Sequence, residues 1–112
     1  MACLCAAWCR LCDDYAAVFR TITDRLARER PGLEARWIDI EDEAAVLGDL
    51  DVETFPTLLV RSAAGVLFAG VLEPHGQTLE RVLRACLADP VSTPVDPAFE
   101  ALGDRLWSAL MR

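Results

Sequence analysis

Two cysteines, Cys9 and Cys12, stand three residues apart at the start of an amphipathic segment. Residues at this spacing on the first turn of a helix lie about 5 to 6 Å apart, within the range that a disulfide spans. A cysteine at a helix N-terminus is stabilised as the thiolate by free backbone N–H groups and the helix dipole. We therefore expect a reversible dithiol–disulfide pair, in which Cys9 attacks as the thiolate and Cys12 resolves.

The other three cysteines are interpreted as packing residues. Cys3 and Cys5 alternate along an apolar segment, so on a strand they share the face that points into the core. Cys86 lies on the apolar side of a later helical segment. Two alternatives stay open for Cys3 and Cys5. One of them could exchange disulfides with Cys12. Alternatively, the protein could be a non-catalytic binding module, or Cys9, Cys12 and Cys3 or Cys5 could hold zinc or an iron–sulfur centre.

Composition limits the classes of partner. The chain has 112 residues and a net charge of −7, which argues against a nucleic-acid-binding face. Seven acidic residues fall between Asp39 and Glu53 with no arginine among them, and we interpret this stretch as a solvated face. The chain is too apolar for disorder, at 54% hydrophobic residues. No apolar run approaches the roughly 20 residues of a membrane helix, so no membrane partner is expected.

The start of the chain and the cysteine usage predict the compartment. The segment before Cys9 has neither the basic start nor the long apolar stretch of a secretory signal. Five cysteines are an odd number, which favours catalytic or free thiols in a reducing compartment over a disulfide framework. We expect a cytoplasmic protein.

Apolar periodicity predicts the elements that position the cysteines. A strand at 2–7 precedes a helix at 10–29, which ends at Arg30-Pro31-Gly32. The elements expected next are a strand at 36–40, a helical turn at 43–47, strands at 57–61 and 66–71, and a helix at 77–87. This order predicts an α/β fold with a mixed central sheet of about four strands flanked by helices.

Residues 89–112 are predicted to form a separate unit beyond the domain of residues 1–88. A linker containing Pro90 and Pro94 leads to Asp96-Pro97, a capping side chain and a proline that suit the start of a helix. The helix carries an apolar stripe too strong to face water. We expect it to pack on the domain or at a dimer interface, which makes the protein a monomer or a weak homodimer.

The motifs around the cysteine pair resemble those of the thioredoxin family. Trp8 immediately precedes Cys9, as is typical of thioredoxins, and Phe55-Pro56-Thr57 looks like the family's cis-proline turn ahead of a core strand. The resemblance covers roughly residues 2–87. It implies a thioredoxin-like fold, and the extra C-terminal helix lies outside it.

This resemblance implies a thiol–disulfide oxidoreductase that acts on disulfides of protein substrates and is regenerated by an electron donor that the sequence does not identify. Neither a metal nor an organic cofactor is needed. The residues implied to bind substrate are Trp8, Arg10, Phe55, Pro56 and Gly70.

Three departures from the family pattern have consequences. The first strand and helix of full thioredoxins are lacking, and Arg10-Leu11 replaces the usual Gly-Pro between the cysteines. The buried Asp of thioredoxin aligns with Cys3 and its Lys partner with about Trp37, so both charges are replaced together by apolar groups. Without this base, we expect Cys12 to resolve mixed disulfides slowly.

Overall fold

The structure is a computed structural model that describes residues 1–6, 10–48, 50, 52, 55–63, 65–89 and 94–110, except for the side chains of Leu11 and Leu110. Its elements are β1 (Ala2–Cys5), α1 (Arg10–Glu29), β2 (Arg36–Asp39), α2 (Ala44–Leu47), β3 (Thr57–Ser62), β4 (Gly65–Val71), α3 (Gly76–Ala88) and α4 (Pro97–Leu110). The predicted class, an α/β fold with a four-stranded mixed sheet flanked by helices, is confirmed.

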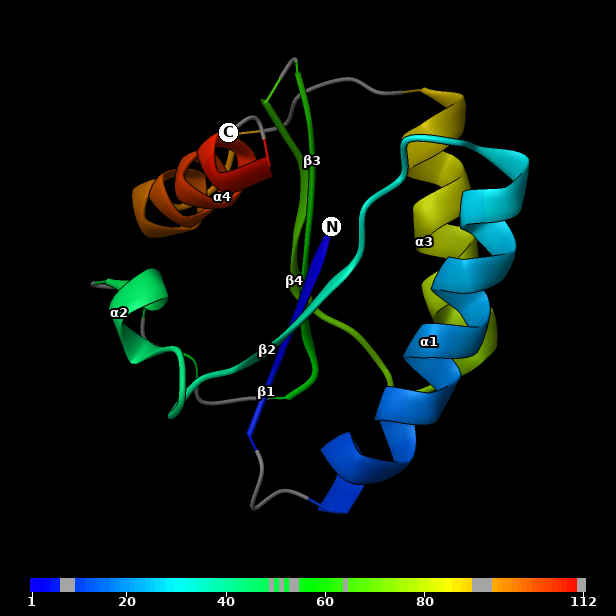
Figure 1. The fold of residues 1–112 in the computed structure, drawn as a ribbon, viewed down its shortest axis with the longest axis horizontal. Coiled ribbons are helices and arrows are strands. Elements are labelled where there is room, and N and C mark those ends of the chain that lie inside the picture. The colour runs from blue at the N-terminus through cyan, green and yellow to red at the C-terminus, as the bar shows by residue number, and fades with distance from the viewer. Residues whose placement is uncertain are drawn as a thin grey trace.

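The sheet has the strand order β2-β1-β3-β4. Strands β1 and β2 are parallel and are connected by α1, whereas β3 pairs antiparallel with both β1 and β4 (Figure 1). The β3–β4 hairpin closes at Gly65, whose φ of 126° lies in the region that favours glycine. Strand β1 is therefore central, and its C-terminal end leads to the start of α1.

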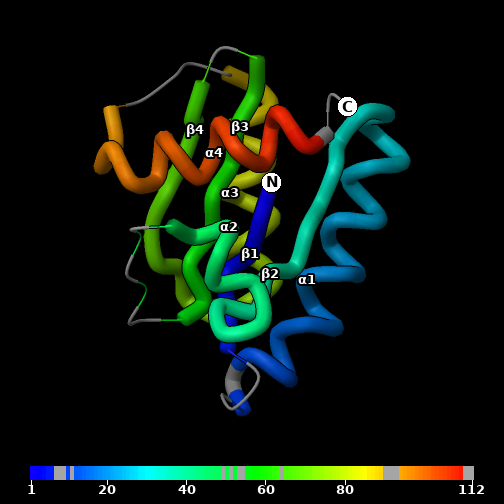
Figure 2. The backbone as a smooth tube through the Cα atoms, turned by 60° about the vertical axis from the view of Figure 1, so that its left-hand side comes forward, coloured from blue at the N-terminus to red at the C-terminus, as the bar shows by residue number. Residues whose placement is uncertain are grey.

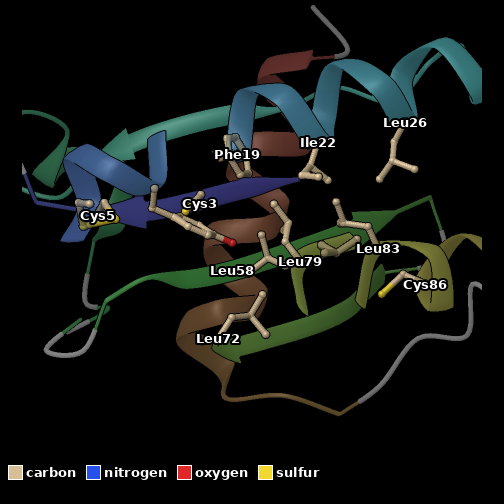
Figure 3. Close-up of a cluster of buried hydrophobic side chains, with 13 residues drawn as sticks. Cys3, Cys5, Phe19, Ile22, Leu26, Leu58, Leu72, Leu79, Leu83 and Cys86 are labelled. Atoms are coloured by element: carbon tan, nitrogen blue, oxygen red, sulfur yellow. A yellow bond between two sulfur atoms is a disulfide. The ribbon is translucent and has the colours of Figure 1, made fainter. Parts of the chain in front are cut away.

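Alternation along β1 divides the core into two clusters. Cys3 and Cys5 belong to the cluster on the side of α1 and α3, which Figure 3 shows. Ala2 and Leu4 belong to the cluster on the other side, where α2 and α4 lie (Figure 1). Because successive side chains of a strand point to opposite faces, Cys3 and Cys5 lie on the same side of the sheet.

Helix α1 packs on the sheet through a stripe at three- and four-residue steps. Its buried residues are Cys12, Tyr15, Phe19, Ile22, Thr23 and Leu26. Two ion pairs connect its outer side to α3: Arg25 pairs with Glu80, and Arg84 lies 3.0 Å from Glu29. The helix ends before Gly32, which has a φ of 103°.

Helix α4 lies across β3 and β4 on the opposite face (Figure 2). Its start is capped by Asp96, whose Oδ1 accepts a hydrogen bond from the Ala98 amide at 2.8 Å. Leu102 is fully buried in the second cluster. None of the helices that the structure describes is both long and apolar enough to cross a membrane.

The first strand is shorter than its sequence predicts. We expected it to span residues 2–7, but β1 ends at Cys5, and Ala6 is buried outside the strand. Ala7 lies outside the described residues. The apolar composition of this segment reflects burial, which continues beyond the last residue that pairs with β2 and β3.

Candidate functional site

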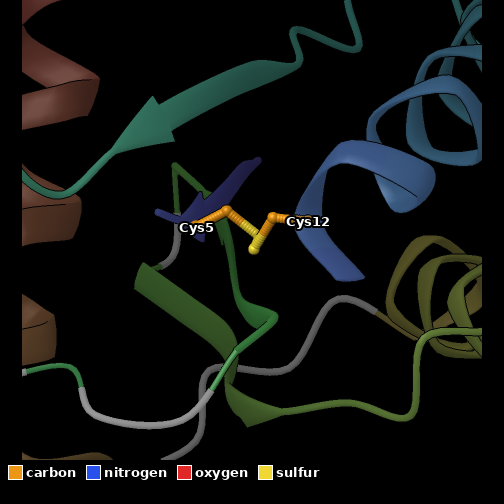
Figure 4. The surroundings of a disulfide bond; sticks show 2 residues. All are labelled: Cys5 and Cys12. Atoms are coloured by element: carbon orange, nitrogen blue, oxygen red, sulfur yellow. A yellow bond between two sulfur atoms is a disulfide. The ribbon is translucent and has the colours of Figure 1, made fainter. Parts of the chain in front are cut away.

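A disulfide joins Cys5, the last residue of β1, to Cys12 on the first turn of α1 (Figure 4). The two alpha carbons are 5.8 Å apart, within the usual range for a disulfide. Both residues are buried, with 1% of Cys5 and 3% of Cys12 exposed. The bond therefore connects the central strand to the helix that crosses over it.

This linkage corrects the expectation for Cys5, and it gives Cys12 a partner other than Cys9 in this structure. Cys5 was expected to be a free packing thiol; it is buried, but its sulfur is bonded to Cys12. Cys12 was expected to pair with Cys9, and in this structure its partner is Cys5. The physical reason is that strand alternation points Cys5 toward α1, whose first turn stands over the end of β1. Cys9 and Trp8 lie outside the described residues.

Pro56 lies at the same end of the sheet as the disulfide. The antiparallel register pairs Leu4 with Thr57, so one further step along the two strands brings Cys5 beside Pro56. The Phe55–Pro56 peptide bond is cis, and Pro56 is among the fully buried residues. Its carbonyl accepts a hydrogen bond from the Leu72 amide at 3.1 Å, which fixes the proline segment to the end of β4.

The remaining candidate substrate-binding residues are dispersed around this end. Phe55 is half-buried and packs on the cluster that contains Cys12. Arg10 is exposed at the first position of α1. Gly70 is half-buried on β4 and lies one strand further from β1, because β3 runs between them. The structure thus brings Phe55 and Pro56 close to the disulfide and leaves Gly70 farther away.

Cys3 and Trp37 occupy the two positions at which the family resemblance implies a buried charged pair. They are register partners on the parallel strands β1 and β2. Cys3 is a free thiol, and burial raises its pKa from its ordinary value of 9.0 to about 12. At neutral pH this thiol is protonated, so it has no capacity to accept a proton from a neighbour.

Tyr15 is a residue of the site that the sequence did not predict. It lies one turn after Cys12 on the same face of α1, and its ring is 6.4 Å from that of Trp37. Its hydroxyl is buried and has no hydrogen-bond partner among the residues described. Burial, together with nearby Cys3, raises the pKa of Tyr15 above its usual range. The three-residue spacing from Cys12 was the available signal.

Cys86 is a free, buried thiol at the opposite end of the cluster from Cys5 (Figure 3). Burial raises its pKa above the ordinary value. The packing interpretation is therefore confirmed for Cys3 and Cys86, and it is wrong for Cys5.

The described residues contain no group of three or more His, Cys, Asp or Glu side chains that could hold a metal ion. Cys5 and Cys12 are close enough to share a ligand, but their sulfurs are bonded to each other. A metal needs thiolates, and a disulfide supplies none. In this oxidised state neither sulfur is available as a thiolate ligand for a metal.

A cavity of about 280 Å³ opens at the other end of the sheet, between β2, β3 and α4. Arg61 and Trp107 stand on its wall, and the guanidinium carbon of Arg61 lies 5.0 Å from the centre of the Trp107 ring. None of the described residues that line the cavity is a cysteine or histidine, so these residues are separate from the cysteine cluster.

The chain matches no family model, no curated protein and no solved structure.

Proposed function

We propose that this protein is a thiol–disulfide oxidoreductase that reduces or exchanges disulfides of protein substrates, in the manner of thioredoxin-like proteins. The Cys5–Cys12 disulfide carries the proposal, because it puts an oxidised sulfur on the first turn of α1 beside the proline segment. The mixed sheet with helices on both faces is compatible with a thioredoxin-like arrangement. The cis bond before Pro56 agrees with the same resemblance.

Burial excludes four of the five cysteines as the residue that attacks the substrate. Cys3, Cys5, Cys12 and Cys86 are all buried, with between 1% and 8% of each exposed. A buried sulfur cannot reach a disulfide on the surface of a large substrate. Of the five cysteines in the sequence, this leaves Cys9 as the proposed attacking residue. It immediately precedes Arg10, the first residue of α1, a position that favours the thiolate.

The proposed reaction transfers two electrons from the protein to the substrate. The Cys9 thiolate attacks one sulfur of the substrate disulfide, whose S–S bond breaks, and the departing substrate thiolate takes up a proton. Cys12 then loses its proton and attacks the Cys9 sulfur. The second substrate sulfur leaves as a thiol, and the protein is left with a disulfide. An external dithiol donor restores the reduced form.

The second step is proposed to be slow. Cys12 must lose a proton inside the core, in a buried cluster that also contains Cys3 and Tyr15. Burial raises the pKa of Cys3 to about 12 and that of Tyr15 above its usual range, so both are protonated at neutral pH. Neither can act as a general base, because a base must be deprotonated to accept the proton.

Reduction of insulin by the dithiol form tests the proposal. The metal-free wild-type protein, supplied with dithiothreitol, is expected to accelerate insulin precipitation over dithiothreitol alone. Cys9→Ser is the negative control, and Cys86→Ser is the matched control for loss of a cysteine remote from the site. Wild-type activity no greater than that of Cys9→Ser would refute the function.

Trapping identifies the substrate class. A Cys12→Ser variant lacks the resolving thiol, so a substrate attacked by Cys9 stays attached through a mixed disulfide. Adducts are expected that dithiothreitol releases and that are missing in a Cys9→Ser/Cys12→Ser double variant. Equal adduct yields from both variants would show that attachment does not pass through Cys9.

A further inference from the structure

We infer that Cys5 is a third redox-active residue. By disulfide exchange it replaces Cys9 as the partner of Cys12, so that the resting oxidised protein holds a buried Cys5–Cys12 bond and a free Cys9. This inference rests on the proposed function and deepens it. It gives the protein two oxidised forms in place of one.

The positions of the two residues carry the inference. Cys5 ends a strand that pairs with β2 on one side and β3 on the other, and Cys12 lies on a helix packed into the same cluster. Their alpha carbons are held 5.8 Å apart by regular elements. Reacting groups that are fixed at bonding range have a high effective concentration, which favours the bond between them.

The exchange step conserves electrons. The Cys5 thiol loses its proton, and the thiolate attacks the Sγ atom of Cys12 in the Cys9–Cys12 disulfide. The Cys5–Cys12 bond forms, the Cys9–Cys12 bond breaks, and Cys9 leaves as a thiolate, which takes up the proton that Cys5 loses. Cys9 directly precedes the first residue of α1, a position that favours a thiolate and therefore its departure in exchange. The oxidising equivalents come from the substrate disulfide and remain in the protein.

The free thiol Cys3 provides an internal contrast. Cys3 and Cys5 are both 1% exposed, both lie on β1, and both face the same cluster. Only Cys5 is bonded to Cys12. Burial alone therefore does not select the partner of Cys12; position along the strand does. Cys3→Ser is consequently the matched control for Cys5→Ser.

Burial of the new bond changes how the protein is reduced. Cys5 and Cys12 are too buried for direct attack by an external thiol. Reduction must pass back through Cys9, whose thiolate attacks Cys12 and restores the Cys9–Cys12 disulfide. Cys9 is therefore needed both to enter and to leave the Cys5–Cys12 state.

The cleavage sites in the sequence allow disulfides of Cys12 with Cys3, Cys5 and Cys9 to be distinguished. Trypsin cuts after Arg10, and chymotrypsin cuts after Leu4, Trp8 and Tyr15, so the two enzymes place Cys3, Cys5 and Cys9 on peptides 1–4, 5–8 and 9–10. Reduced full-length protein is mixed with glutathione disulfide, quenched with acid at successive times, alkylated with N-ethylmaleimide and digested. Mass spectrometry then identifies the peptide linked to Cys12.

In the wild type and in Cys3→Ser, the Cys9–Cys12 linkage is expected to appear first and to be replaced by Cys5–Cys12, with Cys9 alkylated. In Cys5→Ser the Cys9–Cys12 linkage is expected to persist. In Cys9→Ser the Cys5–Cys12 bond is expected to form at least about tenfold more slowly than in the wild type, because both thiols are buried.

Two results would overturn the inference. One is a wild type that ends in the Cys9–Cys12 linkage with Cys5 alkylated. The other is Cys5–Cys12 formation in Cys9→Ser at the wild-type rate. If Cys5→Ser fails to fold, the linkages measured in the wild type and in Cys9→Ser still test the inference. Failure of the proposed function is a separate result, because the linkages are mapped with glutathione disulfide and insulin reduction is measured independently.

Discussion

The two faces of the sheet are built from the same strands but differ in chemistry. The face covered by α1 and α3 holds Cys3, Cys5, Cys12 and Cys86, together with the unpartnered hydroxyl of Tyr15. Among the residues that the structure describes, the buried cluster on the face covered by α2 and α4 consists of Ala, Leu, Ile and Val side chains. Leu4 and Cys5 are adjacent on β1, but their side chains point to opposite faces of the sheet. We propose that the first face carries the reactivity and that the second contributes stability.

The contacts around α4 explain how the second face is stabilised. Leu102 fills the core, and the Arg105 guanidinium donates to the carbonyls of Val46 and Leu47 at 2.7 and 2.8 Å, which connects α4 to α2. Gly103 lets α4 approach the sheet, because a Cβ atom there would lie 3.2 Å from side-chain atoms of Arg61 and Val66. None of these contacts involves a sulfur atom.

The largest expected effect comes from removing the resolving thiol. Cys12→Ser is predicted to lower the steady-state rate of insulin reduction by about a thousandfold, since a lost nucleophile costs roughly 4 kcal/mol in transition-state free energy. The rate is measured on protein whose circular dichroism matches that of the wild type. A loss below about tenfold would show that Cys12 is dispensable and that the first face is not the reactive one.

The opposite pattern is predicted on the second face. Leu102→Ala removes a fully buried side chain and is expected to lower the free energy of unfolding by about 3 kcal/mol, measured by urea denaturation. Insulin reduction per folded molecule is expected to stay at the wild-type level. Leu102→Met is the control and should cost less than about 1.5 kcal/mol. A large drop in turnover for either variant would break the division between the faces.

Cys3 predicts a pH dependence of stability. Below pH 9 the thiol is protonated in both the folded and the unfolded chain. Above pH 9 the unfolded chain loses this proton while the folded protein retains it, because burial raises the folded pKa to about 12. The free energy of unfolding is therefore expected to fall by about 1 kcal/mol between pH 9 and 10 from this group. Urea denaturation of wild type and Cys3→Ala measures this contribution.

In Cys3→Ala the decline over the same pH interval is expected to be shallower by that amount. The variant has a lower stability at pH 8 because of the lost volume, so the slopes are compared and not the absolute values. Equal slopes in the two proteins would contradict the raised pKa. A shallower pH dependence of the unfolding free energy in Cys3→Ala would show that burial on the first face opposes ionisation of the Cys3 thiol.

An effect of similar size is predicted at the edge of the second face. Trp107→Leu removes the ring under the Arg61 guanidinium and is expected to lower the free energy of unfolding by about 1 kcal/mol. Trp107→Phe keeps an aromatic ring and is expected to lose less. Thermal denaturation of the reduced proteins measures both. A Trp107→Leu protein as stable as the wild type would show that this contact contributes nothing to the docking of α4.

The sequence was sufficient for the elements and the division into faces. Apolar spacing predicted α1 at its observed bounds, and alternation predicted that Cys3 and Cys5 share a face. It was not sufficient for the partner of Cys12. That choice depends on where the first turn of α1 stands over β1, which is set by packing between elements and not by local spacing. For the same reason, the buried hydroxyl of Tyr15 was visible only in the structure.

The central claim is that the disulfide of Cys12 is reversible in the folded protein. The most direct test equilibrates the wild type in glutathione buffers of graded potential and measures the fraction of Cys12 in a disulfide by alkylation, with circular dichroism recorded alongside. We predict one reversible two-electron transition, about 30 mV for each tenfold change in the ratio of oxidised to reduced protein, with the secondary structure retained throughout. A Cys12 disulfide that persists at every potential until the protein unfolds would mark it as a purely structural bond and contradict the account.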